Sequence, residues 1–169
     1  MTEGATGDLA ARAARVIDAA RARGVMLATA ESCTGGLIGA VLTEIAGASD
    51  VFDRGFITYS NAAKTQMLGV LPATLRAHGA VSEEVAAEMA AGARRNSAAT
   101  LAISVTGVAG PGSSGTKPEG RVCFGLSDRA GTSTETVEFG AIGRENVRRA
   151  TVAHALAMLL AALGSERAE

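Results

Sequence analysis

Apolar residues recur along the chain at two spacings, one typical of helices and one typical of strands. Helical spacing runs from Asp8, a plausible N-cap, through positions such as Leu9, Ala13 and Val16 to Arg23. The same criteria predict helices over 37–47, 61–70, 72–79, 83–96 and 144–163. Short apolar runs predict strands over 25–32, 52–59, 100–107, 121–128 and 133–140, and the last two form a hairpin.

Helices and strands therefore alternate along most of the 169 residues. This order predicts an α/β fold, a three-layer α/β/α sandwich. The closing hairpin requires antiparallel pairing, so the sheet is expected to be mixed. We expect a single domain over residues 8–165, preceded by a disordered lead-in over residues 1–7.

Composition narrows the classes of function. With 16 basic and 17 acidic side chains the net charge is -1, which gives no electrostatic footprint for nucleic acid or an anionic membrane. Aromatic residues make up only 3%, too few for a surface that stacks bases. Two cysteines outside any CxxC pattern argue against a disulfide framework or zinc site and favour a reducing cytoplasm. We expect no metal, no cofactor and no membrane span.

The first chemical candidate is the segment AESCTGG, where a predicted strand meets a glycine turn that opens a helix. Ser32 in that position is exposed to substrate, and backbone N–H groups nearby can hold an oxyanion. Gly35 and Gly36 let a substrate approach the backbone closely. Two other interpretations stay open: Ser32 or Thr34 is only a helix N-cap, or Cys33 is the nucleophile.

A serine nucleophile needs a base, and the chain offers few. His78 and His154 stand in helices with no motif around them, so a Ser-His-Asp triad has little support. A Ser-Lys pair is an alternative that requires a lysine with a lowered pKa. Lys64 follows the second strand by a few residues and is expected to reach Ser32. Tyr59, the only tyrosine, is expected to orient it; the alternatives are a solvated lysine and a half-buried strand aromatic.

Two further segments suit a phosphate. The loop VTGVAGPGSSG at the end of the third predicted strand offers backbone N–H groups, with Thr106 at the strand end, although it matches no P-loop. Arg144 and Arg148 are four residues apart and share one face of the last helix. Arginine in a first helical turn opposes the helix dipole, which favours a binding role. A plain connecting loop and a solvated helix face are the alternatives.

Together these segments resemble the C-terminal domain family of the competence/damage-inducible protein CinA, which includes stand-alone nicotinamide-nucleotide amidohydrolases. The matching strings are TAESCTGGLIGAVLT, ITYSNAAKTQMLGV, GAVSEEVAAEMAAGAR and SVTGVAGPGSSGTKPEGRVCFGL, in the family's order. The resemblance implies hydrolysis of nicotinamide mononucleotide (NMN) to nicotinic acid mononucleotide and ammonia. It also implies Ser32 as nucleophile, Lys64 as general base, Tyr59 as an assisting residue, and a homo-oligomer. The substrate-binding residues it implies are Glu31, Thr34, Gly35, Gly36, Thr106, Gly107, Gly110, Arg144 and Arg148.

The chain departs from the family pattern at two positions. Gly143 stands where the family usually has Asp, and Glu119 stands where it often has Val. Three other functions remain: an amidase for a different amide, a non-catalytic nucleotide-binding module, and a role on DNA. The net charge of -1 and the scarcity of aromatic residues speak against the last.

Overall fold

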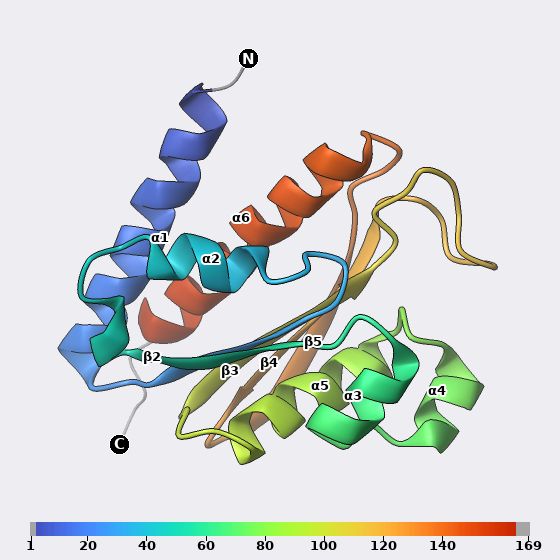
Figure 1. Ribbon diagram of the computed structural model, residues 1–169, viewed down its shortest axis with the longest axis horizontal. Coiled ribbons are helices and arrows are strands. Elements are labelled where there is room, and N and C mark those ends of the chain that lie inside the picture. The colour runs from blue at the N-terminus through green and yellow to red at the C-terminus, as the bar shows by residue number, and fades with distance from the viewer. Residues whose placement is uncertain (1–2, 165–169) are drawn as a thin grey trace.

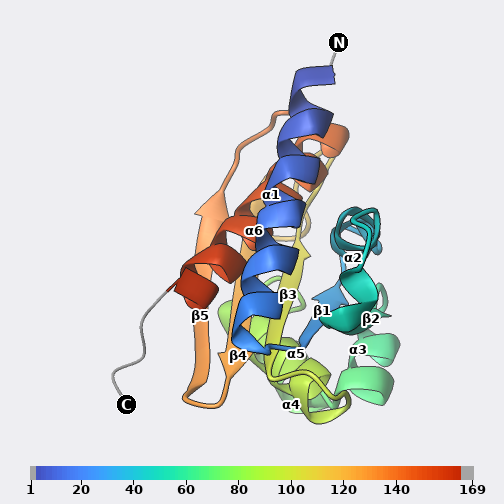
Figure 2. The ribbon, with the colours of Figure 1, turned by 90° about the vertical axis from the view of Figure 1, so that its left-hand side faces the viewer.

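The computed structural model describes residues 3–164 and arranges them as three layers (Figures 1 and 2). The helices are α1 (Glu3–Arg23), α2 (Leu37–Thr43), α3 (Asn61–Leu68), α4 (Pro72–His78), α5 (Glu83–Arg95) and α6 (Arg144–Gly164), with a short 3₁₀ turn at Ala48–Asp50. The strands are β1 (Leu27–Glu31), β2 (Phe52–Ile57), β3 (Leu101–Gly107), β4 (Arg121–Asp128) and β5 (Gly131–Glu138).

The five strands form one mixed sheet in the order β2-β1-β3-β4-β5. β1 pairs in parallel with both β2 and β3, so the carboxyl ends of these three strands meet at one edge. β3, β4 and β5 pair antiparallel. The predicted mixed sheet and its closing hairpin are therefore confirmed.

Helices cover both faces of the sheet, as Figure 1 shows, with α1, α2 and α6 on one side and α3, α4 and α5 on the other. Each face has its own apolar cluster: Ile17, Phe124 and Leu156 belong to the first, Leu68 and Met89 to the second. Strand β1 is buried along its whole length because it lies between these layers. The α/β/α sandwich predicted from the order of elements is confirmed.

Helix α6 has 21 residues and a mean hydropathy of 1.3, enough in length and composition to cross a membrane. No span was expected from the sequence. In the structure one stripe of α6, including Val147, Leu156 and Leu159, is fully buried against α1 and the sheet. A stripe of this kind is typical of a helix that packs one face on a protein core, and α6 packs in that way here.

Several element boundaries differ from those expected. Helix α1 begins at Glu3, so residues 3–7 of the expected lead-in are helical, and residues 1–2 lie outside the described range. Asp8 therefore lies inside the helix, where its carboxylate accepts a hydrogen bond from Arg12 at 2.9 Å and caps nothing. Ser60 caps α3, since its hydroxyl accepts the N–H of Ala63. Ser82 caps α5 in the same way, by accepting the N–H of Val85.

Candidate active site

Ser32 stands at the carboxyl edge of the sheet, directly after β1. Its backbone N–H donates to the carbonyl of Val105 at 3.1 Å, which continues the pairing of β1 with β3 by one residue. The chain then turns sharply, and the N–H of Gly35 donates back to the carbonyl of Ser32 at 3.0 Å. Backbone hydrogen bonds therefore hold both the N–H and the carbonyl of Ser32, the candidate nucleophile.

Lys64, from α3, reaches this serine from the neighbouring strand connection. Its side chain is 1% exposed, so the solvated-lysine interpretation is wrong. The amine Nζ lies 3.0 Å from Ser32 Oγ and 2.8 Å from the carbonyl oxygen of Thr58, with the carbonyl of Tyr59 at 3.5 Å. Burial lowers the pKa of Lys64, while the nearby Cys33 thiol opposes that shift. The structure thus brings Lys64 to Ser32, as expected, and buries the amine.

The turn between β1 and α2 is held by Glu31. Its carboxylate, 1% exposed, accepts the N–H groups of Ile38 at 2.8 Å and Gly39 at 3.0 Å, and the hydroxyl of Thr34 at 2.7 Å. No side chain caps α2 at Gly36, so the interpretation of Ser32 or Thr34 as its N-cap is wrong. Glu31, expected to bind substrate, instead has its oxygens occupied within the protein.

Cys33 is the rival nucleophile, and its surroundings disfavour it. The thiol is buried, and burial raises its pKa to about 12. A thiolate, the reactive form of cysteine, is therefore scarce at neutral pH. The serine hydroxyl beside a buried amine is the better nucleophile in this turn.

Tyr59 and Arg144 meet at the mouth of the site. Tyr59 is 64% exposed and lies beyond the end of β2, so it is not a half-buried strand aromatic. Its hydroxyl accepts a hydrogen bond from Arg144 at 3.2 Å, and the same guanidinium donates to the carbonyl of Gly110 at 2.7 Å. Tyr59 thus contacts Lys64 through its backbone carbonyl, while its phenol points to α6.

The other predicted binding residues differ in what they contact. Arg148 donates to the carbonyl of Thr34 at 2.9 Å, which joins α6 to the nucleophile turn. The Thr106 hydroxyl donates to the carbonyl of Ala80 at 2.7 Å. Gly107 is a packing requirement, because a Cβ there would lie 2.6 Å from the Val122 side chain.

The two residues that depart from the family pattern make defined backbone contacts. Glu119 accepts the N–H of Gly112 at 2.7 Å and so ties the ends of the glycine-rich loop together. Gly143 precedes α6 with φ +91°, and its carbonyl accepts the N–H of Val147. Glycine lets the chain enter α6 in this conformation without strain.

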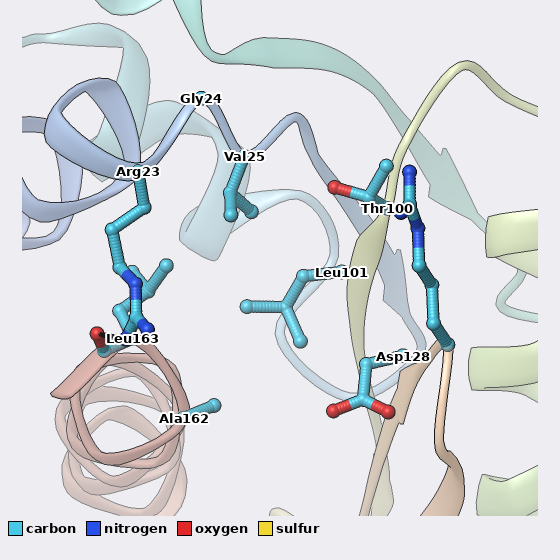
Figure 3. Close-up of a pocket in the computed structure, with 9 residues that line it drawn as sticks. Arg23, Gly24, Val25, Thr100, Leu101, Asp128, Ala162 and Leu163 are labelled. Atoms are coloured by element: carbon cyan, nitrogen blue, oxygen red, sulfur yellow. Dashed lines mark hydrogen bonds between the residues drawn. The ribbon is translucent and has the colours of Figure 1, made fainter. Parts of the chain in front are cut away.

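A separate pocket of about 240 Å³ opens at the opposite end of the strands (Figure 3). It lies where α1 and α6 end and where β1 and β3 begin, and Arg23, Val25, Leu101 and Asp128 line it. It includes neither Ser32 nor Lys64. This pocket and the Ser32–Lys64 pair therefore lie at different ends of the sheet.

Two contributors could not be read from the sequence. The carbonyl of Thr58 binds the Lys64 amine, and backbone oxygens carry no sequence signal. Ile57 is 53% exposed, and its Cδ1 would lie 2.8 Å from a Cβ at Gly36, so it forms an apolar wall beside the turn. Its place within a predicted strand, two residues before Tyr59, was the available hint.

In this α/β domain a buried lysine lies against a serine at the glycine turn after β1, the middle of its three parallel strands, and this arrangement defines the class of site. The chain belongs to the CinA C-terminal domain family, whose pattern matches residues 9–163. It is 49% identical over 146 residues to the nicotinamide-nucleotide amidohydrolase PncC of Escherichia coli strain K12, covering 86% of this chain and 88% of that protein.

Solved structures agree with this assignment. The competence/damage inducible protein CihA of Agrobacterium tumefaciens superposes with a TM-score of 0.89 at 49% identity, covering 94% of this chain and 96% of that one. The competence damage-inducible protein A (ComA) of Klebsiella pneumoniae superposes with a TM-score of 0.91 at 38% identity, covering 94% and 99%. A putative competence-damage inducible protein of Symbiobacterium thermophilum is 48% identical, and the match covers 81% of this chain and 34% of that longer protein.

Proposed function

We propose that this protein is a nicotinamide-nucleotide amidohydrolase that converts NMN and water to nicotinic acid mononucleotide and ammonia. The observation that carries the proposal is the 3.0 Å approach of the buried Lys64 amine to Ser32 Oγ. The similarity to PncC along most of both chains supplies the substrate class. Within this proposal the enzyme works in the cytoplasm, where its two buried free thiols remain reduced.

The contacts of Lys64 suit a neutral amine. A neutral amine has two N–H donors and one lone pair, and the carbonyls of Thr58 and Tyr59 stand ready to accept from the donors. The lone pair is then left for the Ser32 hydroxyl proton. Burial, which lowers the pKa of Lys64, favours this neutral form.

The reaction proceeds through an acyl-serine. Ser32 Oγ attacks the carboxamide carbon and gives its proton to Lys64, which passes it to the departing ammonia as the C–N bond breaks. Water then attacks the acyl-serine, gives a proton to Lys64, and the carboxylate leaves as the proton returns to Ser32. The unprotonated amine is restored after each turnover.

The oxyanion needs donors near Ser32. Gly35 is unavailable, since its N–H already donates to the Ser32 carbonyl. The N–H groups of Thr34 and Gly36 donate no hydrogen bond within the described part of the chain. We assign these two amides to the oxyanion, in keeping with the role of backbone N–H groups in acyl transfer.

The phosphate of NMN is assigned to the α6 end of the site. Arg144 and Arg148 both present guanidinium groups there. Within residues 3–164 these groups donate to neutral oxygens, namely the carbonyls of Gly110 and Thr34 and the Tyr59 hydroxyl. A phosphate is a stronger acceptor than any of these, and arginine can bind it bidentately. Thr106 and Gly107 then act by shaping the neighbouring strand end.

The test measures ammonia release from NMN by the purified protein beside Ser32→Ala, Lys64→Ala and Cys33→Ala. Ser32→Ala and Lys64→Ala are expected to lose at least about a thousandfold in kcat. Cys33→Ala is the matched control, since it changes the adjacent buried side chain and is expected to stay within a few fold of the wild type.

Near-normal turnover by Ser32→Ala would contradict the nucleophile assignment. A folded wild type that releases no ammonia from NMN, yet hydrolyses another amide in a panel of pyridine carboxamides and their nucleotides, would move the assignment to that amide. Binding of NMN without turnover of any amide would favour a nucleotide-binding module.

A further inference from the structure

Glu31 is a buried carboxylate that the mechanism above leaves without a role. Successive side chains of a strand point to opposite faces of the sheet, so Glu31 and Ser32 face opposite ways. The contacts agree: Glu31 meets Ile38 and Gly39 at the start of α2, whereas Ser32 meets Lys64 of α3. The carboxylate therefore lies behind the nucleophile turn, away from the reacting hydroxyl.

We infer that Glu31 is a positioning residue that, through the hydroxyl and backbone of Thr34, aims the oxyanion-binding amides of the turn. This inference rests on the proposed amide hydrolysis. It replaces the substrate contact expected of Glu31 with an action through another residue.

Thr34 connects the two sides of the turn. Its hydroxyl donates to Glu31 at 2.7 Å, and its carbonyl accepts from Arg148 at 2.9 Å and from the N–H of Leu37 at 3.2 Å. The hydroxyl bond holds the Thr34 side chain, and the carbonyl bonds hold the peptide unit that Thr34 shares with Gly35, so the backbone around the Thr34 N–H is restrained from both directions. The direction of the Thr34 amide is thus set by Glu31 from one side and by Arg148 from the other.

Glu31 also decides which amides remain for an oxyanion. It occupies the N–H groups of Ile38 and Gly39, which would otherwise attract an anion to the start of α2. The unoccupied amides of Thr34 and Gly36 lie closer along the chain to Ser32. A small displacement of such donors reduces catalysis strongly, because they must match the transition state rather than the substrate.

A pair of substitutions at Thr34 tests the inference with little change in volume. Thr34→Val removes the hydroxyl bond to Glu31 and is expected to lower kcat for NMN by about 10- to 100-fold, with KM within about twofold. Thr34→Ser keeps the hydroxyl and is expected to restore most of the rate. Glu31→Gln places an amide N–H₂, itself a donor, beside the backbone N–H groups that the carboxylate accepts. It is expected to lose at least as much kcat as Thr34→Val.

Thr29→Val is the matched control. The Thr29 hydroxyl also faces Glu31, but at 3.4 Å and from within β1, away from the turn. Its loss is expected to leave kcat within about twofold. Melting temperatures of all four variants separate a loss of positioning from a loss of folding.

A second readout does not depend on the identity of the substrate. A fluorophosphonate probe phosphonylates an activated serine and places its oxygen where the oxyanion would lie, so intact-mass kinetics report the same donors. Thr34→Val is expected to slow labelling of Ser32 by a factor similar to its loss in kcat, and Thr34→Ser to recover it.

The outcomes separate the two proposals. Unchanged kcat and unchanged labelling in both Thr34→Val and Glu31→Gln would overturn the positioning role, as would a higher KM at constant kcat. A wild type that releases no ammonia but shows the expected labelling pattern supports positioning and overturns the proposed substrate. A wild type that shows neither reaction overturns both.

Discussion

The two ends of strands β1 and β3 differ in what they offer a ligand. At their start lies an open pocket of about 240 Å³ between the ends of α1 and α6 (Figure 3). At their carboxyl end lies the Ser32–Lys64 pair, 8% and 1% exposed. The pocket at the first end includes neither of these residues, whereas the burial of an amine against a hydroxyl directs attention to the second end. The reactivity of a site depends on the desolvation and orientation of its groups rather than on the volume of a cavity.

The largest expected effect comes from changing the base at the carboxyl end. Lys64→Arg keeps a positive charge but cannot become neutral, so it is expected to lose at least about a thousandfold in kcat at every pH. Under the proposed mechanism only the neutral amine of the wild type is active. Since burial lowers the pKa of Lys64, kcat/KM should rise as pH increases through that lowered pKa and level off above it.

Rates of ammonia release from about pH 5 to about pH 10 test this dependence. A wild-type profile that falls with rising pH, or that does not change over the range, would contradict a lysine base. Partial recovery of Lys64→Ala by a small primary amine in solution would support the assignment independently of pH.

Tyr59→Phe is expected to have an intermediate effect. It removes only the hydroxyl that accepts from Arg144, while the backbone carbonyl near Lys64 remains. We expect KM for NMN to rise about three- to tenfold with kcat nearly unchanged, as for the loss of one hydrogen bond of typical net strength. Steady-state kinetics decide between this result and a drop in kcat, which would make the phenol part of proton transfer.

The smallest effect is expected at the other end of the strands. Arg129 is exposed and lines the pocket between the ends of α1 and α6. Arg129→Ala is expected to change neither kcat nor KM for NMN by more than about twofold, since surface substitutions away from the site are nearly neutral. A large change in either constant would show that the two ends are coupled and that the contrast drawn between them is wrong.

Much of the carboxyl end could be predicted because its signals are local. A strand, a glycine turn and a helix start in quick succession placed Ser32, and the scarcity of other bases indicated Lys64. The burial of Lys64 could not be predicted, because it depends on the packing of α3 and α5 against the sheet.

The role of Glu31 was missed for a related reason. Glu31 stands directly before Ser32, so its carboxylate was expected to contact substrate. Only the alternation of side chains along β1, combined with the position of α2, places that carboxylate on the opposite face from the Ser32 hydroxyl. The binding of phosphate by Arg144 and Arg148 stays a prediction, and their bonds to the carbonyls of Gly110 and Thr34 join segments far apart in sequence. Sequence patterns carry little information about such backbone partners.

The parallel pairing of β1 with both its neighbours has a consequence for the order of folding. A parallel pair cannot close through a tight hairpin, so each partner of β1 is joined to it by a long crossover. The nucleophile peptide is anchored to Val105, which lies well beyond Lys64 in the chain. Contacts of such sequence separation form slowly. We therefore expect a chain emerging from the ribosome to bring Ser32 and Lys64 near each other early, yet to acquire a competent site only after β3 has docked.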